Sequence, residues 1–262
     1  NELLNITRPD VILEIHEAYL RAGADIIETN TFGATSVVLA EYNVQHRTTA
    51  INRAAARIAC AARDHFTTED HPRYVAGSLG PTTKTLTVTG GITFQDLSLS
   101  YYEQVKALLV EDIDLLLLET SQDTLNVKAA CIGIERAFHE IGKRLPLIIS
   151  GTIEPMGTML AGQNIEAFYL SIEHVKPIAV GLNCATGPEF MKDHIRSLSN
   201  LATCATSCYP NAGLPDEDGN YLETPSSLAK KLGEFAEAGW LNLVGGCCGT
   251  TPEHIEAISR AV

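Results

Sequence analysis

The chain has 262 residues, of which 45% are hydrophobic, enough to fill the core of one large domain. Its formal net charge is −13 at pH 7 and no cluster of Lys or Arg stands out, which argues against nucleic acid and anionic membrane surfaces as partners. No apolar run approaches the ~20 residues of a membrane span, and no signal peptide is visible. Seven cysteines, an odd number, are typical of a reducing compartment, so we expect a cytoplasmic protein.

Helix and strand patterns alternate along the whole chain. In chain order we predict helix 7–22, strand 25–31, a helical stretch over 35–65 in two pieces, strand 74–79, helix 95–112, strand 114–120, helix 124–142, strand 146–152, helix 164–175, strand 177–184, helix 188–199, strand 202–209, helix 225–238, strand 241–247 and helix 252–262. Three of the later helices begin with a proline at the first helical position, namely Pro188, Pro225 and Pro252.

Strict alternation of helices and strands predicts a parallel sheet with helical crossovers. The pattern holds eight helices but seven strands and opens on a helix, which favours a (β/α)8 TIM barrel whose first strand precedes residue 1. We expect residues 1–262 to form a single barrel domain and to be a fragment of a larger multidomain protein, since the chain begins with Asn1. The alternative is a doubly wound open sheet, which usually carries a Gly-rich phosphate loop that is absent here.

Three cysteines stand at predicted strand ends, where such barrels place their active sites. Cys184 ends strand 177–184, and the adjacent Cys247 and Cys248 stand at the end of strand 241–247, with Gly245 and Gly246 before them and Gly249 after them. Neighbouring Cα atoms are ~3.8 Å apart, too close for an ordinary disulfide, but glycines allow a bend that aims both sulfurs at one metal. The pattern predicts a Cys₃ zinc site with an open fourth position. Three thiolates leave such a centre at net −1, suited to binding a soft thiol as thiolate for alkyl transfer.

Polar residues at other strand ends are candidates for substrate binding. Glu119 follows four consecutive leucines, so its carboxylate needs a partner, and the ammonium group of an amino-acid substrate would be one. The alternative is a buried ion pair or a hydrogen bond to a neighbouring loop. We expect Asn30, Ser78 and Asn183 to bind substrate as well. Asn211, after strand 202–209, is either a transient fourth zinc ligand or an ordinary turn residue.

The stretches GLNCA, YPNAG and VGGCCGT resemble those of the homocysteine S-methyltransferase family. Softer matches such as ADIIETNTF resemble its branch formed by the N-terminal module of cobalamin-dependent methionine synthase. The resemblance implies zinc held by Cys184, Cys247 and Cys248, with the homocysteine sulfur as fourth ligand. It also implies methylcobalamin as donor on a separate cobalamin-binding module, recharged from methyltetrahydrofolate on a folate-binding module. The family's Asp-Gly-x-Met-Gly motif of the first strand is absent here.

Three other functions remain open at this point. The first is a stand-alone methyltransferase that uses S-methylmethionine or betaine with the same zinc and thiol chemistry. The second is a module that presents homocysteine without turnover by itself. The third is a redox protein that uses Cys247 and Cys248, which the strained geometry of adjacent cysteines disfavours.

Overall fold

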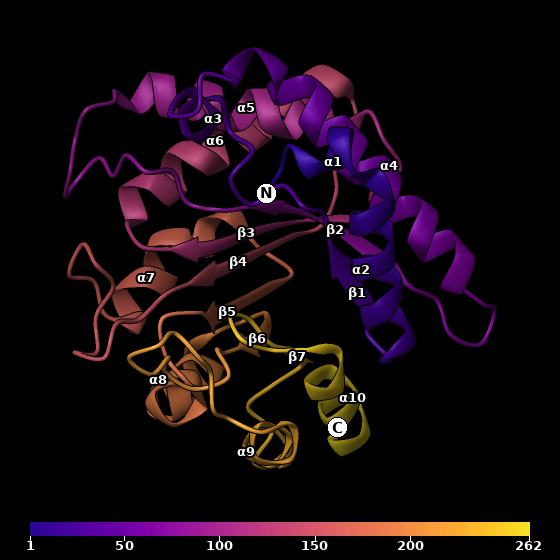
Figure 1. Ribbon diagram of the computed structural model, residues 1–262. Helices are drawn as coiled ribbons and strands as arrows, with labels where there is room; N and C mark the ends of the chain where they lie inside the picture. Colours follow the sequence, from indigo (N-terminus) through magenta and orange to yellow (C-terminus); the bar gives the residue numbers. More distant parts are fainter. The chain divides into compact units, whose positions relative to one another are not determined.

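The computed structural model describes residues 1–262 and contains one seven-stranded sheet in the order β1-β2-β3-β4-β5-β6-β7 (Figure 1). Neighbouring strands are parallel in the pairs β1–β2, β2–β3, β4–β5, β5–β6 and β6–β7. The strands are β1 (Ile26–Glu28), β2 (Tyr74–Leu79), β3 (Leu115–Ser121), β4 (Leu147–Gly151), β5 (Ala179–Asn183), β6 (Ala205–Tyr209) and β7 (Leu243–Val244). The predicted α/β architecture with parallel strands is confirmed.

Helices separate the strands as the sequence pattern predicts. They are α1 (Leu4–Thr7), α2 (Pro9–Arg21), α3 (Ser36–Ala40), α4 (Thr48–Phe66), α5 (Phe94–Leu109), α6 (Thr124–Ile141), α7 (Ile165–Ile172), α8 (Pro188–Leu201), α9 (Pro225–Glu237) and α10 (Pro252–Ala261), with 3-10 turns η1 (Gln45–Arg47) and η2 (Glu173–Val175). The helix predicted over 7–22 is α2, which begins at Pro9 because the fixed φ and missing N–H of proline suit a first turn. The short helix α1 before it was not predicted. Pro188, Pro225 and Pro252 each stand at the start of a helix, as predicted.

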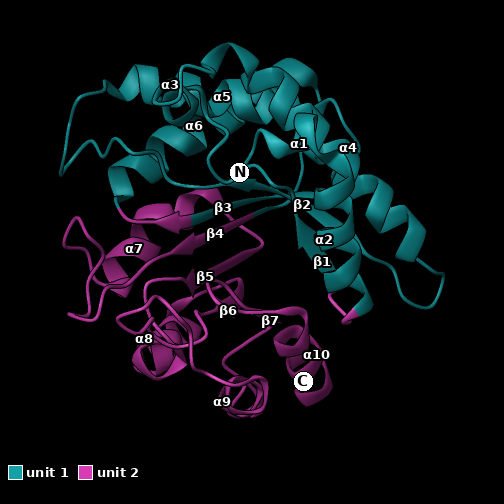
Figure 2. Cartoon of the chain, viewed as in Figure 1, with its two compact units in different colours: residues 1–21, 25–119, 123–147 teal, residues 22–24, 120–122, 148–262 magenta.

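The chain forms two compact units (Figure 2). Unit 1 comprises Asn1–Arg21, Asp25–Glu119 and Asp123–Leu147, and unit 2 comprises Ala22–Ala24, Thr120–Gln122 and Ile148–Val262. We predict from the sequence that the whole chain behaves as one domain, and this stays a prediction. No helix of the protein is both long enough and apolar enough to cross a membrane.

In unit 1, helices α5 and α6 pack closely against each other. Gly133 makes this possible, since a Cβ there would lie 2.4 Å from the carbonyl oxygen of Ser98. A small cluster of Ala34, Leu39 and Ile51 packs with Val44. Cys131 and Cys60, on α6 and α4, are buried and behave as small hydrophobes.

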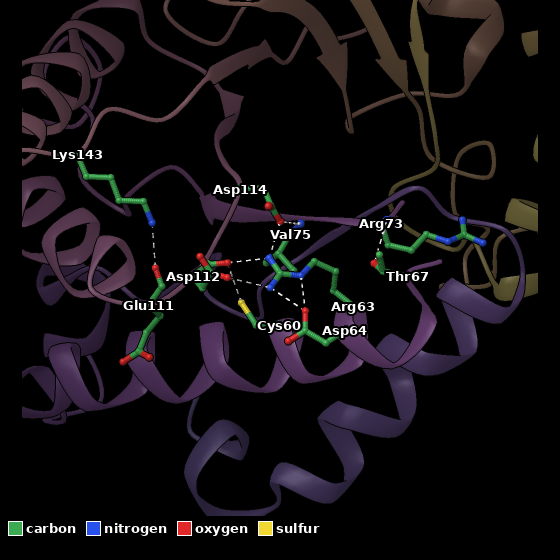
Figure 3. A network of polar contacts seen from close by, with 10 residues as sticks. All are labelled: Cys60, Arg63, Asp64, Thr67, Arg73, Val75, Glu111, Asp112, Asp114 and Lys143. Carbon is green, nitrogen blue, oxygen red and sulfur yellow. Dashed lines mark hydrogen bonds and ion pairs between the residues drawn. The ribbon is translucent and has the colours of Figure 1, made fainter. Parts of the chain in front are cut away.

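A buried arginine joins helix α4 to the segments that enter β2 and β3 (Figure 3). Arg63 donates to the Asp112 carbonyl oxygen at 2.7 Å and to Asp114 Oδ2 at 2.8 Å. The same Asp114 oxygen accepts the backbone N–H of Val75 at 2.7 Å. Because the side chain of Arg63 is only 10% exposed, these contacts replace the water that a guanidinium would otherwise bind.

In unit 2, β4 pairs with β5 and β5 pairs with β6 along most of their lengths, whereas β7 has only two residues. The strand predicted over 241–247 therefore ends early, and Cys247 and Cys248 lie in the turn beyond it. Pairing nonetheless continues without regular strand geometry: Gly245 N–H donates to the Cys208 carbonyl oxygen at 3.1 Å, and Cys247 N–H to that of Pro210 at 2.8 Å. These bonds hold the turn against the end of β6.

Candidate metal centre

Cys184 leaves the end of β5 in a left-handed turn. Its φ is 60° and that of Ala185 is 57°, a conformation that residues with a Cβ rarely adopt. The turn is closed by the N–H of Thr186, which donates to the Cys184 carbonyl oxygen at 2.7 Å. Two consecutive left-handed residues end the strand geometry of β5 and turn the chain at Cys184, whose sulfur lies beside that of Cys248. Backbone strain of this kind is maintained at functional sites.

The turn that carries Cys247 and Cys248 is held by its own hydrogen bonds. Thr250 donates its N–H and its hydroxyl to the Cys247 carbonyl oxygen at 3.1 and 2.7 Å. Gly249 takes a φ of 78°, which completes the reversal without the cost that a Cβ would add. The bend expected from the flanking glycines is present.

The three sulfurs gather into one cluster in unit 2. Cys248 Sγ lies 3.7 Å from Cys184 Sγ and 3.9 Å from Cys247 Sγ, and all three lie within 4.8 Å of one another. With zinc–sulfur bonds of about 2.3 Å, the edge of a tetrahedron is about 3.8 Å. The sulfurs therefore stand at the spacing that a tetrahedral zinc ion needs, and the donor set fits that metal. All seven cysteines are free, so no disulfide competes for these atoms.

The close approach of the sulfurs separates their acidities. Hydrogen bonds from Cys184 and Cys247 lower the pKa of Cys248 to about 3, with a further contribution from the hydroxyl of Tyr221. The hydrogen bonds with Cys184 and Cys248, together with burial, raise the pKa of Cys247. The Cys248 thiolate is thus stabilised by two neighbouring thiols. A bound cation would displace the protons of those thiols and leave three thiolates.

Asn183, directly before Cys184, is completely buried and uses both ends of its amide. Its Oδ1 accepts the N–H of Thr120 at 3.0 Å and the hydroxyl of Ser150 at 2.7 Å. Its Nδ2 donates to Thr120 Oγ1 at 2.8 Å and lies 3.9 Å from Cys247 Sγ. The Asn183 side chain is therefore hydrogen-bonded inside the protein and contacts the cysteine cluster from its buried side.

The side chain of Asn211 also contacts the cluster, at the backbone of Cys248. Its Oδ1 accepts the N–H of Cys248 at 3.1 Å, and the side chain is 4% exposed. This contact fixes the turn that presents Cys248 and leaves the second lone pair of the amide oxygen available.

The other candidate residues belong to unit 1. Ser78 donates its hydroxyl to Glu119 Oε1 at 2.6 Å, and both residues are buried. Asn30 instead binds the N-terminal segment, donating to Asn5 Oδ1 at 3.0 Å. Glu119 also shares a hydrogen bond with Glu28. Removal of water by the surrounding protein raises the pKa of the Glu28 carboxyl, and the hydrogen bond with Glu119 acts against this rise.

The sequence alone gave no role to Thr120, which stands at a predicted strand end, and it did not single out Ser150 or Tyr221. Thr120 has a φ of 53° and meets Asn183 with both its N–H and its hydroxyl. Nothing in a periodic pattern marks a residue that acts through such a turn. Tyr221 lies in the irregular segment after β6. The only feature of the sequence that could have indicated a role for it is that this segment follows the carboxyl end of a barrel strand, where active sites lie.

A separate open pocket of about 500 Å³ lies in unit 2 beside the start of α8. Its lining includes Glu189, Phe190, Leu214 and Leu222, and none of the three clustered cysteines. The chemistry of the sulfurs therefore identifies the candidate site better than the size of this pocket does.

Comparison with known proteins identifies the fold and the family of this chain. The homocysteine methyltransferase MmuM from Escherichia coli, in oxidized and in metallated form, superposes with a TM-score of 0.82 and 23% identity over 100% of this chain and 89% of that chain. An aldo/keto reductase from Brucella melitensis gives a TM-score of 0.52 and 14% identity over 95% of this chain and 82% of that one. At these identities the likeness shows the fold, a (β/α)8 barrel of which this chain holds seven strands. The profile of the homocysteine S-methyltransferase family matches residues 1–262, and the chain therefore belongs to that family.

Proposed function

We propose that this chain holds a zinc ion through Cys184, Cys247 and Cys248 and uses it to activate the sulfur of homocysteine for methyl transfer, giving methionine. The observation that carries the proposal is the sulfur spacing of 3.7 and 3.9 Å, which matches the edge of a zinc tetrahedron. Family membership over the whole chain supplies the substrate class.

A zinc ion bound there would lower the pKa of a fourth thiol, so that homocysteine is held as thiolate near neutral pH. The thiol proton then leaves to solvent when the substrate binds. In the transfer, a lone pair of the homocysteine sulfur forms the new bond to the methyl carbon, while the pair of the broken bond stays with the donor. Three cysteine thiolates would offset the charge of the metal, so a sulfur bound beside them would stay electron-rich.

The neighbouring amides would keep this arrangement in place. Asn183 is a positioning residue in this proposal, because its Nδ2 lies against Cys247 Sγ while its Oδ1 is occupied. Asn211 orients Cys248 through its N–H, and its spare lone pair makes it the candidate for the fourth position before a thiol arrives.

We further propose that Glu119 binds the amino group of the substrate, with Ser78 orienting the carboxylate. Two carboxyl groups that share a hydrogen bond, as Glu119 and Glu28 do, need a proton between them or a cation beside them. An ammonium group would be such a cation. Asn30 is retained as a substrate-binding candidate on sequence grounds alone.

As donor we propose methylcobalamin carried by another module, with a folate-binding module to recharge it. The support is the YPNAG and ETNTF stretches of the sequence. The competing donors are S-methylmethionine and betaine. Supplying each of the three donors in turn to the zinc-loaded chain with homocysteine, and measuring methionine, distinguishes them. Turnover with none of them would identify a substrate-presenting module.

The metal assignment is tested by zinc content. We expect one zinc per chain, loss of tight binding in Cys248→Ala, and no change in the control variant Cys204→Ala, whose side chain lies outside the cluster. X-ray absorption should show three sulfur ligands, rising to four when homocysteine is added. Full zinc occupancy in Cys248→Ala, or an unchanged shell with substrate bound, would contradict the proposal.

A further inference from the structure

The turn that carries Cys247 and Cys248 runs directly into helix α10, whose first turn holds a buried histidine. His254 is 6% exposed and lies three residues after Thr251, the residue that caps the helix. Both nitrogens of its ring have partners. Nδ1 lies 3.1 Å from the backbone nitrogen of Thr251 and 3.0 Å from its hydroxyl oxygen, and Nε2 lies 2.9 Å from the carbonyl oxygen of Glu223.

These partners determine which ring nitrogen carries the proton. A backbone N–H can only donate, so Nδ1 accepts from Thr251, and a carbonyl oxygen can only accept, so Nε2 donates to Glu223. His254 is therefore a neutral imidazole with its proton on Nε2. A Glu or Gln at this helix position serves the capping residue, whereas the imidazole also reaches a residue 31 positions earlier in the chain.

Glu223 ends the loop between β6 and α9, and its backbone continues the bond from His254 back to the cysteine turn. The Glu223 N–H donates to the Ala212 carbonyl oxygen at 3.2 Å, and the Ala212 N–H donates to the Cys248 carbonyl oxygen at 2.9 Å. All these bonds run in one direction, from the N–H of Thr251 to the carbonyl oxygen of Cys248. Because Thr251 and Cys248 are three residues apart, the bonds close into a ring, and hydrogen bonds aligned in this way strengthen one another.

The loop segment in this ring also joins the two parts of the cysteine cluster. Asn211, next to Ala212, donates its N–H to the Thr186 carbonyl oxygen at 3.1 Å, and its side chain accepts the N–H of Cys248 at 3.1 Å. Thr186 in turn closes the left-handed turn of Cys184 at 2.7 Å. The segment is thus a backbone bridge between Cys184 and Cys248, and the bonds that hold it also hold the two sulfurs at their spacing.

We propose that His254 is a positioning residue, which links Glu223 to the cysteine turn and thereby sets the place of Cys248 against Cys184. The inference rests on the proposed function, in which both sulfurs bind one zinc ion. His254 acts through the peptide groups of the loop and not through the sulfurs. Residues 214–220 of that loop are exposed, so the bond from His254 anchors the point at which the loop returns to the protein.

Two substitutions separate this role from the capping of α10. His254→Asn keeps an acceptor at the distance of Nδ1, so the bond from the Thr251 N–H is retained, but its side chain is too short to reach Glu223. His254→Gln restores a donor at the reach of Nε2, and its oxygen can still serve the capping residue.

Amide hydrogen exchange of the metal-free, reduced full chain measures the link directly. In His254→Asn we expect the amides of Ala212 and Glu223 to exchange about 10-fold faster, as for the loss of one buried hydrogen bond. The amides of residues 256–261 in α10 should stay within about twofold, because the cap is kept. His254→Gln should return the loop amides to the rates of the unchanged protein. Zinc affinity, measured against a competing chelator, should fall about 10-fold in His254→Asn and recover in His254→Gln.

Unchanged loop exchange in His254→Asn would overturn the inference, and so would a rise that includes α10, which would assign His254 to the helix alone. Faster loop exchange with unchanged zinc affinity would also overturn it, since the link would then not act on the sulfurs. The control variant His139→Asn replaces an exposed histidine of unit 1 and should change neither measurement.

The exchange measurement needs no metal, so it separates this inference from the proposed function. If the unchanged protein binds no zinc, the proposed function fails and the exchange rates alone decide the inference. If His254→Asn does not fold, the nitrogen NMR signals of the His254 ring in the unchanged protein at pH 8 decide it. A single proton on Nε2 supports the link, and a proton on Nδ1 would overturn it.

Discussion

Asn183 offers a quantitative test of how the cysteine cluster is supported. In Asn183→Ala, the Thr120 N–H and the Ser150 hydroxyl both lose the oxygen to which they donate, at 3.0 and 2.7 Å, in a site with no exposure to solvent. A buried donor left without a partner costs about 1–3 kcal/mol. The two together predict a loss of about 2–6 kcal/mol in the free energy of unfolding. Urea denaturation of the metal-free protein under reducing conditions measures this loss.

The matched control is Ser150→Ala, which removes one donor but leaves Asn183 Oδ1 bonded to the Thr120 N–H, and we expect a loss of about 1 kcal/mol. A loss below 1 kcal/mol in Asn183→Ala, or equal losses in the two variants, would refute the reasoning.

If Asn183→Ala fails to fold, Asn183→Asp tests the same contact. It keeps the oxygen that accepts from Thr120 and Ser150 but replaces the Nδ2 donor facing Cys247 Sγ with an acceptor. Zinc affinity, measured against a competing chelator, should fall by about 10- to 100-fold, as it does when outer partners of metal ligands are lost. An unchanged affinity would show that Asn183 does not support the metal centre.

Three other predictions concern pH and substrate contacts. Burial lowers the pKa of His16 to about 4, so the stability that depends on its neutral form is fully present above pH 6.5 and is lost as the pH falls towards 4. Between pH 7 and 5 the free energy of unfolding should fall by about 2 kcal/mol from this group. His16→Leu should abolish that part of the pH dependence, as measured by urea denaturation. Homocysteine affinity should rise with pH and level off above about 8.5, the usual pKa of a thiol, because binding releases the thiol proton; calorimetric titration that shows no pH dependence would contradict this. Glu119→Gln should weaken homocysteine roughly 30-fold or more while hardly affecting 4-mercaptobutyrate, which lacks the amino group; equal losses for both thiols would assign Glu119 to the fold instead.

The sequence by itself determined the order of the strands and pointed to the three cysteines that the fold gathers into one cluster. The strand β3 is buried along its whole length, as its run of leucines predicts, because a parallel strand covered on both faces leaves no polar positions until its end. The prolines at the starts of α8, α9 and α10 are equally local, since their fixed φ suits the first helical turn wherever the helix lies. Element ends were less well predicted, as β7 shows, because pairing with a neighbour and not propensity decides where a strand stops.

Only the tertiary structure decided how the site is held. That Asn183 serves Thr120 and Ser150, and that Tyr221 covers Gly249, follows from contacts between residues far apart in the chain. Neither contact leaves a periodic trace in the sequence, because each depends on a turn with unusual backbone angles. Cys184, Ala185 and Thr120 take positive φ values although none is a glycine. Such conformations cost energy locally and persist because the surrounding hydrogen bonds favour them, so they are determined by the folded environment and not by the residues that adopt them.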